Sequence, residues 1–367
     1  MAVASACITD LTATQLEDLA ETLGEPKYRA KQVQTWVYQR LALSFEEMTD
    51  LPKFFRQGLA GETRLHSLVP VREVAGHDGT VKALFTLADD KTIESTLMPY
   101  PNTRGRSRCT VCVSTQVGCP IGCPFCATGQ QGFERNLTSG EIIDQVLYFA
   151  RHLRRRESPG CTLERPVTNL VFMGMGEPLA NYDALLLAVG RLNSPEGFGL
   201  GARHMSVSTA GLVPQIERLS RENLQIGLAV SLHAGENKLR DRLVPINRKY
   251  PLERLLPACR KYYQATGRRP SFEYVLFDGI NDSISQARSL VRLTAGWNCH
   301  VNLIQANRTA DRAYQPSPEK AVLAFERELR RSGVNCTLRQ PRGQDIDAGC
   351  GQLRSRFGAF DSPIIRS

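Results

Sequence analysis

Three cysteines stand close together in a short segment rich in glycine and proline. Cys119, Cys123 and Cys126 form a C-x3-C-x2-C pattern directly after a predicted strand. Three thiolates at this spacing can wrap one face of an iron–sulfur cubane, and three ligands for four irons leave one iron open to another ligand. The spacing therefore predicts a cluster that can bind and reduce a substrate.

A zinc site is the alternative interpretation of the same region. Cys109-x2-Cys112 and Cys123-x2-Cys126 make two C-x2-C pairs, which is a common four-thiolate zinc arrangement. This interpretation leaves Cys119 without a role. The chain has 11 cysteines, an odd number, and its N-terminus lacks the basic start and apolar core of a signal peptide. A disulfide framework is therefore not expected, and metal binding or catalysis is favoured.

Small and polar residues follow several predicted strands. Gly176 and Glu177 belong to the segment GMGEP (174–178), which follows one of them. Parallel α/β proteins bind ligands at this carboxyl edge of the sheet. A tight strand-to-helix turn would explain GMGEP without any ligand. Similar positions at the ends of later strands are occupied by Ser208, Ser231, Leu232, His233 and Asn307. Polar groups at several strand ends suit one ligand in the mouth of a barrel.

The segments that must position these residues alternate between strand and helix from Cys109 onward. A capping-box pair, Thr138 and Glu141, marks the start of the first helix. Such alternation predicts a parallel sheet, either closed as a barrel or open. The predicted strands cover 110–115, 168–174, 204–209, 226–232, 271–277, 300–305 and 335–340, and the helices between them include 140–155, 252–264 and 318–332.

The first hundred residues have a different character. Residues 1–62 show helical spacing of apolar positions, and residues 65–98 show the alternation of a small antiparallel sheet with turns at 77–79 and 89–91. Residues 99–108 are predicted to be a linker.

Charge and hydropathy limit the partners and the compartment. Lys and Arg number 46 against 37 Asp and Glu, a net charge of +9 that fits a polyanionic partner. Arginines in 28–40, 104–108 and 151–156 could contact phosphates, although each group could equally be a solvated face. No apolar run is long enough to span a bilayer, so we expect a cytoplasmic protein without a membrane partner.

Longer segments carry a family resemblance. The run CVSTQVGCPIGCPFCATGQQGFERNLTSGEIIDQV (112–146), with GMGEPLANYD, STAGLVPQI, VSLHA and PRGQDIDAGCGQL, resembles the RlmN/Cfr family of radical S-adenosylmethionine (SAM) enzymes that methylate rRNA adenines. The resemblance runs from about Pro26 to Leu353, and Pro178 with Arg342-Gly343 favours the RlmN branch. The chain departs from the family at Arg308, where proline is usual, and at Gly349, where alanine is usual.

The resemblance implies an α/β fold and a domain order. The expected fold is a partial (β/α)6 radical-SAM barrel with an N-terminal helical and small β accessory domain. Residues 1–98 would form this RNA-binding accessory domain, 99–350 the barrel, and 351–367 a tail after the catalytic cysteine.

The resemblance also implies two cofactors. Cys119, Cys123 and Cys126 would bind one [4Fe-4S] cluster, and two SAM molecules would be used per turnover. A flavodoxin or ferredoxin system would supply the electron. The implied SAM contacts are Gly176, Glu177, Ser208, Ser231, Leu232, His233 and Asn307.

The implied reaction is methylation of carbon 2 of an adenine in 23S rRNA, and in tRNA next to the anticodon. Cys350 would carry the methyl group as S-methylcysteine, and Cys112 would resolve the RNA–protein adduct by forming a disulfide with Cys350. Glu94 matches the proton acceptor, although it could simply be a solvated strand residue. Two alternatives stay open, namely methylation of adenine carbon 8 and a non-catalytic, zinc-bound RNA-binding protein.

Overall fold

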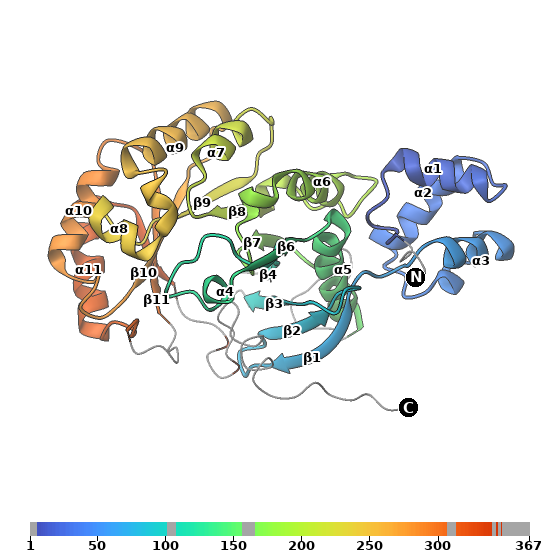
Figure 1. The fold of residues 1–367 in the computed structure, drawn as a ribbon, viewed down its shortest axis with the longest axis horizontal. Helices are drawn as coiled ribbons and strands as arrows, with labels where there is room; N and C mark the ends of the chain where they lie inside the picture. Colours follow the sequence, from blue (N-terminus) through green and yellow to red (C-terminus); the bar gives the residue numbers. More distant parts are fainter. Residues whose placement is uncertain are drawn as a thin grey trace.

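Most strands of the chain join one mixed sheet (Figure 1). The computed structural model describes residues 6–100, 108–155, 166–306 and 313–339, together with Gly343 and Ile346. The sheet has ten strands in the order β1-β2-β3-β4-β7-β8-β9-β10-β11-β12, and β5 (Gln116–Gly118) pairs separately with β6 (Phe133–Asn136).

Seven neighbouring strands of the sheet run parallel to one another. A chain that alternates strands with covering helices gives such a sheet because each crossover returns over the same face. The strands are β4 (Arg108–Cys112), β7 (Asn169–Phe172), β8 (Met205–Thr209), β9 (Gly227–Ser231), β10 (Ser271–Leu276), β11 (His300–Gln305) and β12 (Cys336–Arg339).

Helices cover the outer side of this parallel region (Figure 1). They are α5 (Ser139–Arg155), α6 (Tyr182–Asn193), α7 (Val213–Leu219), α8 (Asn237–Leu243), α9 (Leu252–Thr266), α10 (Ile284–Thr294) and α11 (Glu319–Arg331). Short turns η3 (Pro178–Asn181), η4 (Ala202–His204) and η5 (Pro245–Arg248) join them. The expected partial (β/α)6 barrel is confirmed, and β12 adds one more parallel strand.

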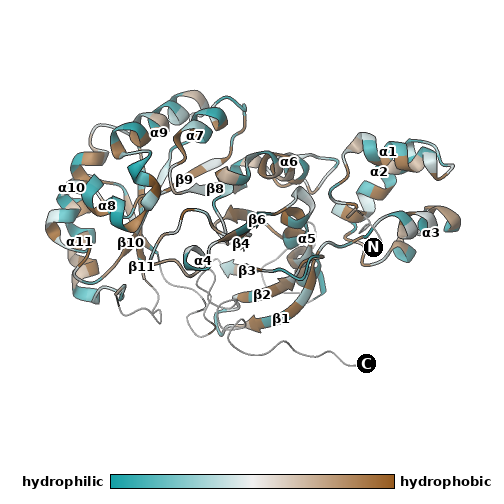
Figure 2. Cartoon of the chain, in the orientation of Figure 1, coloured by the Kyte–Doolittle hydropathy of each residue, from teal (hydrophilic) through white to brown (hydrophobic). Residues whose placement is uncertain are grey.

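The burial pattern explains why these segments form strands and helices. In β9, Leu228, Ala229 and Val230 are all buried, as expected for a parallel strand covered on both faces. Figure 2 shows hydrophobic stretches in strands such as β10 and alternating hydrophobic and hydrophilic bands along the outer helices. Thr138 and Glu141 form the predicted capping box, in which each side chain accepts from the other residue's backbone N–H. No helix of the described ranges is long and apolar enough to cross a membrane.

The N-terminal residues form a separate helical lobe beside α5 (Figure 1). It contains α1 (Ala13–Thr22), α2 (Tyr28–Gln34), the π-turn η1 (Thr35–Gln39), η2 (Phe45–Glu47) and α3 (Lys53–Glu62). The lobe is held to α5 by polar contacts. Gly140 N donates to Asp10 Oδ1 at 2.7 Å, and Arg154 Nη1 donates to the Arg40 carbonyl at 2.5 Å.

An antiparallel meander continues the sheet beyond β4. It consists of β1 (Val69–Ala75), β2 (Val81–Thr86) and β3 (Thr92–Tyr100), with turns where the sequence predicts them. The linker expected at 99–108 is wrong at both ends. Pro99 pairs with Cys109 and Tyr100 with Arg108 in the β3–β4 ladder, and the Arg108 guanidinium lies 4.1 Å from the centre of the Tyr100 ring. The boundary placed between residues 98 and 99 stays a prediction.

Gly174 gives a test of how tightly the ends of β4 and β7 are packed. A Cβ there would lie 2.7 Å from the carbonyl carbon and oxygen of Val113, which are backbone atoms that cannot rotate away. We expect Gly174→Ala to lower the free energy of unfolding by about 2 kcal/mol, measured by urea titration. The control is Gly190→Ala, where no atom lies within 4 Å of the new Cβ. That change in α6 should be neutral or stabilising, and equal effects of the two substitutions would contradict the packing described.

Candidate active site

The carboxyl ends of the parallel strands enclose one cavity of about 450 Å³. One wall is the loop after β5, which contributes Cys119, Cys123 and Cys126. The opposite side is made of strand ends and includes Gly176, Glu177, Ser208, Ser231 and His233. Eight of the residues that the sequence predicts therefore line a single space.

Backbone hydrogen bonds hold the cysteine loop in place. Cys119 N donates to the Gly132 carbonyl at 2.8 Å, directly beside the pairing of β5 with β6. Gly118 has φ +76°, and a Cβ there would collide with the same Gly132 oxygen. Cys126 N donates to the Cys123 carbonyl at 3.1 Å and starts α4 (Ala127–Gln130). The loop is closed on itself with its three thiols on the cavity side.

The three thiols suit a cluster. Each is a free, half-buried cysteine. Burial, together with the nearby Cys126 thiol, raises the pKa of Cys119 to about 12, and burial also raises the pKa of Cys123. Thiols in such surroundings become thiolates when a metal replaces their protons. The donor set and the room in front of it therefore fit a cubane bound by three cysteines.

The zinc arrangement considered as an alternative is not assembled. Cys109 is disulfide-bonded and packs in the core, whereas Cys112 is a free thiol outside the cavity wall. In the described part of the chain, no three His, Cys, Asp or Glu side chains are grouped to hold a single metal ion. Cys109 is therefore not available as a partner for Cys123 and Cys126.

The segment after β7 is joined closely to the segment after β4. Gly174 N donates to the Val113 carbonyl at 3.0 Å, and Thr115 N donates to the Met175 carbonyl at 2.8 Å. Gly176 has φ +106° and lies against Gln116, so that glycine is required there by both backbone conformation and space. These contacts place GMGEP beside the cysteine loop.

Glu177 lies at the centre of this junction. Its backbone N donates to Gln116 Oε1 at 2.8 Å, while its carboxylate accepts from Leu179 N at 3.0 Å and from Ala210 N at 2.7 Å. Burial raises the pKa of Glu177 to about 7. The carboxylate thus organises the turn after β8 and keeps lone pairs for a cationic group in the cavity.

His233 has a distinctive place at the end of β9. It has φ +57°, its Nδ1 accepts from Val275 N at 3.1 Å, and its ring meets Phe125 edge-on with centroids 5.2 Å apart. Burial lowers the pKa of His233 to about 3, so the ring is neutral near pH 7 with its proton on Nε2. The Leu232 side chain is fully buried and does not line the cavity, and its contact with SAM stays a prediction. Asn307 is outside the described residues.

Arg240 is a buried residue that the sequence did not single out. It is fully buried and donates to the carbonyls of Ala210 at 2.6 Å, Ser231 at 3.1 Å and Leu232 at 3.2 Å. Burial lowers its pKa to about 10. The Arg240 guanidinium therefore links the segments at the ends of β8 and β9. Nothing in its helical context distinguishes it from a solvated arginine.

A second unforeseen residue, Glu273 of β10, also lines the cavity. Its Oε1 accepts from Asn302 Nδ2 at 2.7 Å, and its Oε2 lies 3.9 Å from Arg339 Nε. The signal available in the sequence was an acidic residue inside an apolar strand, SFEYVLF. A buried acid in a strand of this kind has a partner or a ligand.

Glu94 and Cys112 lie on neighbouring strands just beyond the cavity wall. Thr96 of β3 pairs with both Lys82 and Cys112, so these residues and Glu94 share one face of the sheet. Glu94 is buried and its Oε2 lies 2.8 Å from Lys82 Nζ, which is also buried. Glu94 is therefore not a solvated residue. Burial raises the pKa of Cys112 to about 11. Cys350 is outside the described residues.

Comparisons with known proteins agree with this arrangement. Residues 7–65 match the family model of the ribosomal RNA large subunit methyltransferase N-terminal domain, and residues 113–290 match that of the radical SAM superfamily. A "Probable dual-specificity RNA methyltransferase RlmN" of Heliobacterium modesticaldum is 46% identical over 94% of this chain and 89% of its own length. A "Ribosomal RNA large subunit methyltransferase N" of Nitrosopumilus maritimus is also 46% identical, over 93% of this chain and 96% of its own.

A solved structure extends the similarity to three dimensions. The crystal structure of a radical SAM methyltransferase from Sphaerobacter thermophilus superposes with a TM-score of 0.89 at 48% identity, covering 95% of this chain and 98% of the other. Identity of this level over nearly the whole length shows common descent and a common fold. The chain belongs to the RlmN family of radical SAM methyltransferases.

Proposed function

We propose that this enzyme methylates carbon 2 of an adenine in 23S rRNA, and in tRNA next to the anticodon, through S-methylcysteine at Cys350. The observation that carries the proposal is the single cavity in which the three free thiols face GMGEP and the strand-end serines. Relatives named as RNA methyltransferases, some of dual specificity, support RNA as the substrate. We place the protein in the cytoplasm.

The cavity residues would bind one [4Fe-4S] cluster and SAM, with two SAM molecules used per turnover. When bound, the cluster supplies the electron that cleaves SAM to a 5′-deoxyadenosyl radical. Cys119, Cys123 and Cys126 would hold three irons, and Glu177 would accept from the SAM ammonium group. Gly176 lets the ligand reach the backbone, while Ser208, Ser231 and neutral His233 offer further polar contacts. A flavodoxin or ferredoxin system would be the reductant.

Two cysteines would carry the methyl group and release the product. Carbon 2 of adenine is electron-poor, so direct displacement on a SAM methyl group is unpromising. The Cys350 thiolate would instead take a methyl group from one SAM by displacement. The 5′-deoxyadenosyl radical formed from a second SAM would remove one hydrogen from this methyl group, and the resulting methylene radical would add to the ring carbon. The adduct would lose one electron, which the oxidised iron–sulfur group would accept, and one ring proton. The Cys112 thiolate would then attack the Cys350 sulfur and form the S–S bond. The S–C bond to the RNA would break with its electron pair passing into the ring, and the methylene carbon would take up a proton to become the methyl group. Cys112 is free and faces the same side of the sheet as Glu94.

Glu94 would accept the proton that leaves the adenine ring, and Lys82 would position it. Both side chains are buried and 2.8 Å apart. A buried charge needs a partner that compensates for its lost hydration. The Lys82 ammonium would thus hold the Glu94 carboxylate in place, and its charge also lowers the pKa of the neighbouring Cys112 thiol, against the larger effect of burial.

The proposed reaction is tested by mass spectrometry of the RNA product. We expect reconstituted enzyme with SAM, reductant and an rRNA fragment to give 2-methyladenosine after nuclease digestion, matched by retention to a synthetic standard. A product that matches 8-methyladenosine would overturn the proposed position of methylation. Absence of methylated adenosine, with RNA binding retained, would support the non-catalytic alternative.

Lys82→Met tests the role of the buried ion pair. The substitution leaves the Glu94 carboxylate buried without its ammonium partner. Because removal of one partner from a buried pair leaves an uncompensated charge, we expect the free energy of unfolding to fall by about 3 kcal/mol, measured by urea titration. The control is Lys91→Met, which removes an exposed lysine paired with Glu134 on the surface and should change the free energy of unfolding by less than about 1 kcal/mol. Equal effects of the two substitutions would contradict the role given to the buried pair.

A further inference from the structure

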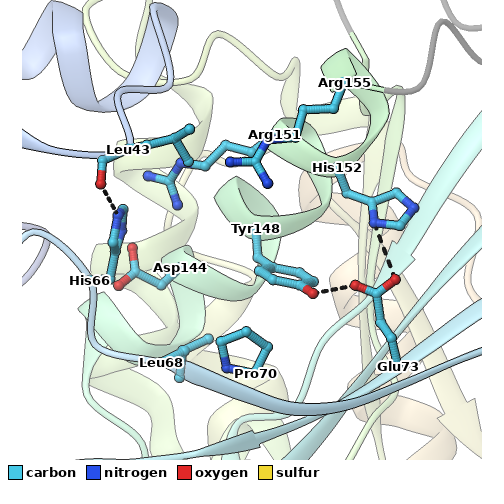
Figure 3. Close-up of a pocket in the computed structure, with 10 residues that line it drawn as sticks. All are labelled: Leu43, His66, Leu68, Pro70, Glu73, Asp144, Tyr148, Arg151, His152 and Arg155. Carbon is cyan, nitrogen blue, oxygen red and sulfur yellow. Dashed lines mark hydrogen bonds and ion pairs between the residues drawn. The ribbon is translucent and has the colours of Figure 1, made fainter. Parts of the chain in front are cut away.

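A second pocket shares no lining residue with the cavity of the thiols and lies on the outer side of the sheet. Its volume is about 370 Å³, and it lies between the N-terminal lobe, β1 and α5 (Figure 3). His66 and Leu43 form the side toward the lobe, and Glu73 belongs to β1. Asp144, Tyr148, Arg151, His152 and Arg155 project from α5. Ligand sites often form where two structural units meet in this way.

Two buried charged groups in this pocket keep unused hydrogen-bonding capacity. Arg151 is 8% exposed, and its Nε lies 3.4 Å from the Leu41 carbonyl, while its Nη2 has no partner among the described residues. Asp144 is 2% exposed. Its Oδ2 accepts from the N and Oγ of Ser67, both at 2.6 Å, whereas its Oδ1 has no partner in the described chain. Each of these two pocket residues therefore has one buried polar atom, a donor in Arg151 and an acceptor in Asp144, without a partner among the described residues.

His66 adds a second free acceptor. Its Nε2 lies 3.0 Å from the Leu43 carbonyl, and because a carbonyl only accepts, Nε2 carries the proton. Burial and the Arg151 charge lower the pKa of His66, so the ring is neutral and Nδ1 is a bare acceptor. Nδ1 has no partner in the part of the chain that the structure describes.

One donor from Arg151 and two acceptors from Asp144 and His66 indicate which kind of ligand the pocket would bind. A simple anion would satisfy Arg151 but would be repelled by Asp144. The matching ligand presents an acceptor beside donors, and the edge of guanine does so with O6, N1–H and the 2-amino group. The pocket also offers flat and apolar surface from Tyr148, Leu68 and Pro70 (Figure 3). Glu73 accepts from the Tyr148 hydroxyl and so holds that ring in position.

We propose that this pocket binds the base of an unstacked guanine nucleotide of the substrate RNA, which rests on the proposed function. Arg151 donates to O6, and Asp144 and His66 accept from the N1–H and 2-amino groups. Arg155 is exposed at the edge of the pocket and can contact the phosphate. A free guanine nucleotide has the same chemistry, and the experiments separate the two sources.

The first experiment measures binding of guanosine, adenosine and inosine 5′-monophosphates and of inorganic phosphate by calorimetry. Saturating S-adenosylhomocysteine blocks the SAM cavity. We expect guanosine monophosphate to bind about tenfold or more tightly than adenosine monophosphate, with inosine between them and no saturable phosphate binding. Arg151→Lys keeps the positive charge but loses the planar pair of guanidinium donors. It should weaken the binding of guanosine monophosphate about tenfold. Arg327→Lys, the same change at an exposed residue of α11 that does not line the pocket, is the matched control.

Several results would overturn the proposal. These are no guanosine monophosphate binding at millimolar concentration, equal binding of the two purines, or an Arg151→Lys variant that is folded by circular dichroism and binds as wild type does. Each would mean that the pocket holds only water.

The second experiment identifies the source of the nucleotide. An rRNA fragment containing 6-thioguanosine is photo-cross-linked to the holoenzyme, and the adduct is mapped by peptide mass spectrometry. We expect cross-links on α5 or β1 that excess guanosine monophosphate suppresses. Guanosine monophosphate binding without such cross-links would overturn the RNA source and leave a free nucleotide as the ligand. Binding that persists in a protein without methylation activity would refute the proposed function alone.

Discussion

The site depends on the junction between the segments that follow β4 and β7. Val113 and Thr115 exchange backbone hydrogen bonds with Gly174 and Met175 across this junction. A Cβ at Gly174 would clash with the backbone of Val113, so the two segments are in the closest contact that their backbones allow. The cysteine loop leaves from one segment and GMGEP from the other. Their joining puts the three thiols and the GMGEP turn in the lining of one cavity.

The parallel sheet and the cysteine site were predictable because their signals are local. Each strand has its own apolar β-branched run, and each helix after it has helical periodicity, so alternation alone indicates the (β/α) topology. The spacing of Cys119, Cys123 and Cys126 predicts the cluster chemistry by itself, because all three cysteines lie within eight consecutive residues. Polar residues at strand ends were expected to converge because a parallel sheet brings carboxyl ends to one edge, and Ser208 and Ser231 do line the cavity.

Other features could not be predicted because they depend on pairing between distant segments. Lys82 and Arg240 look like solvated residues in the sequence, yet both are fully buried, one against Glu94 and the other across three carbonyls. The extent of β3 was underestimated because Pro99 and Tyr100 gain their strand partners from β4. The resemblance places Leu232 among the SAM contacts, whereas the burial of its side chain in the core could not be read from the sequence. Strand register decides which side chains face one another across a sheet, and local sequence patterns do not specify register.

We propose that the three thiols in this cavity hold a four-iron cluster. The most direct test is anaerobic purification followed by visible absorption and iron and sulfide analysis of wild type, Cys123→Ala and Cys299→Ala. We expect a brown wild-type protein with about four irons and four sulfides per chain, and loss of both the colour and the cluster in Cys123→Ala. Cys299 lies outside the cavity wall and its substitution should leave the cluster intact. A colourless wild-type protein that contains zinc, and stays colourless after reconstitution with iron and sulfide, would contradict it.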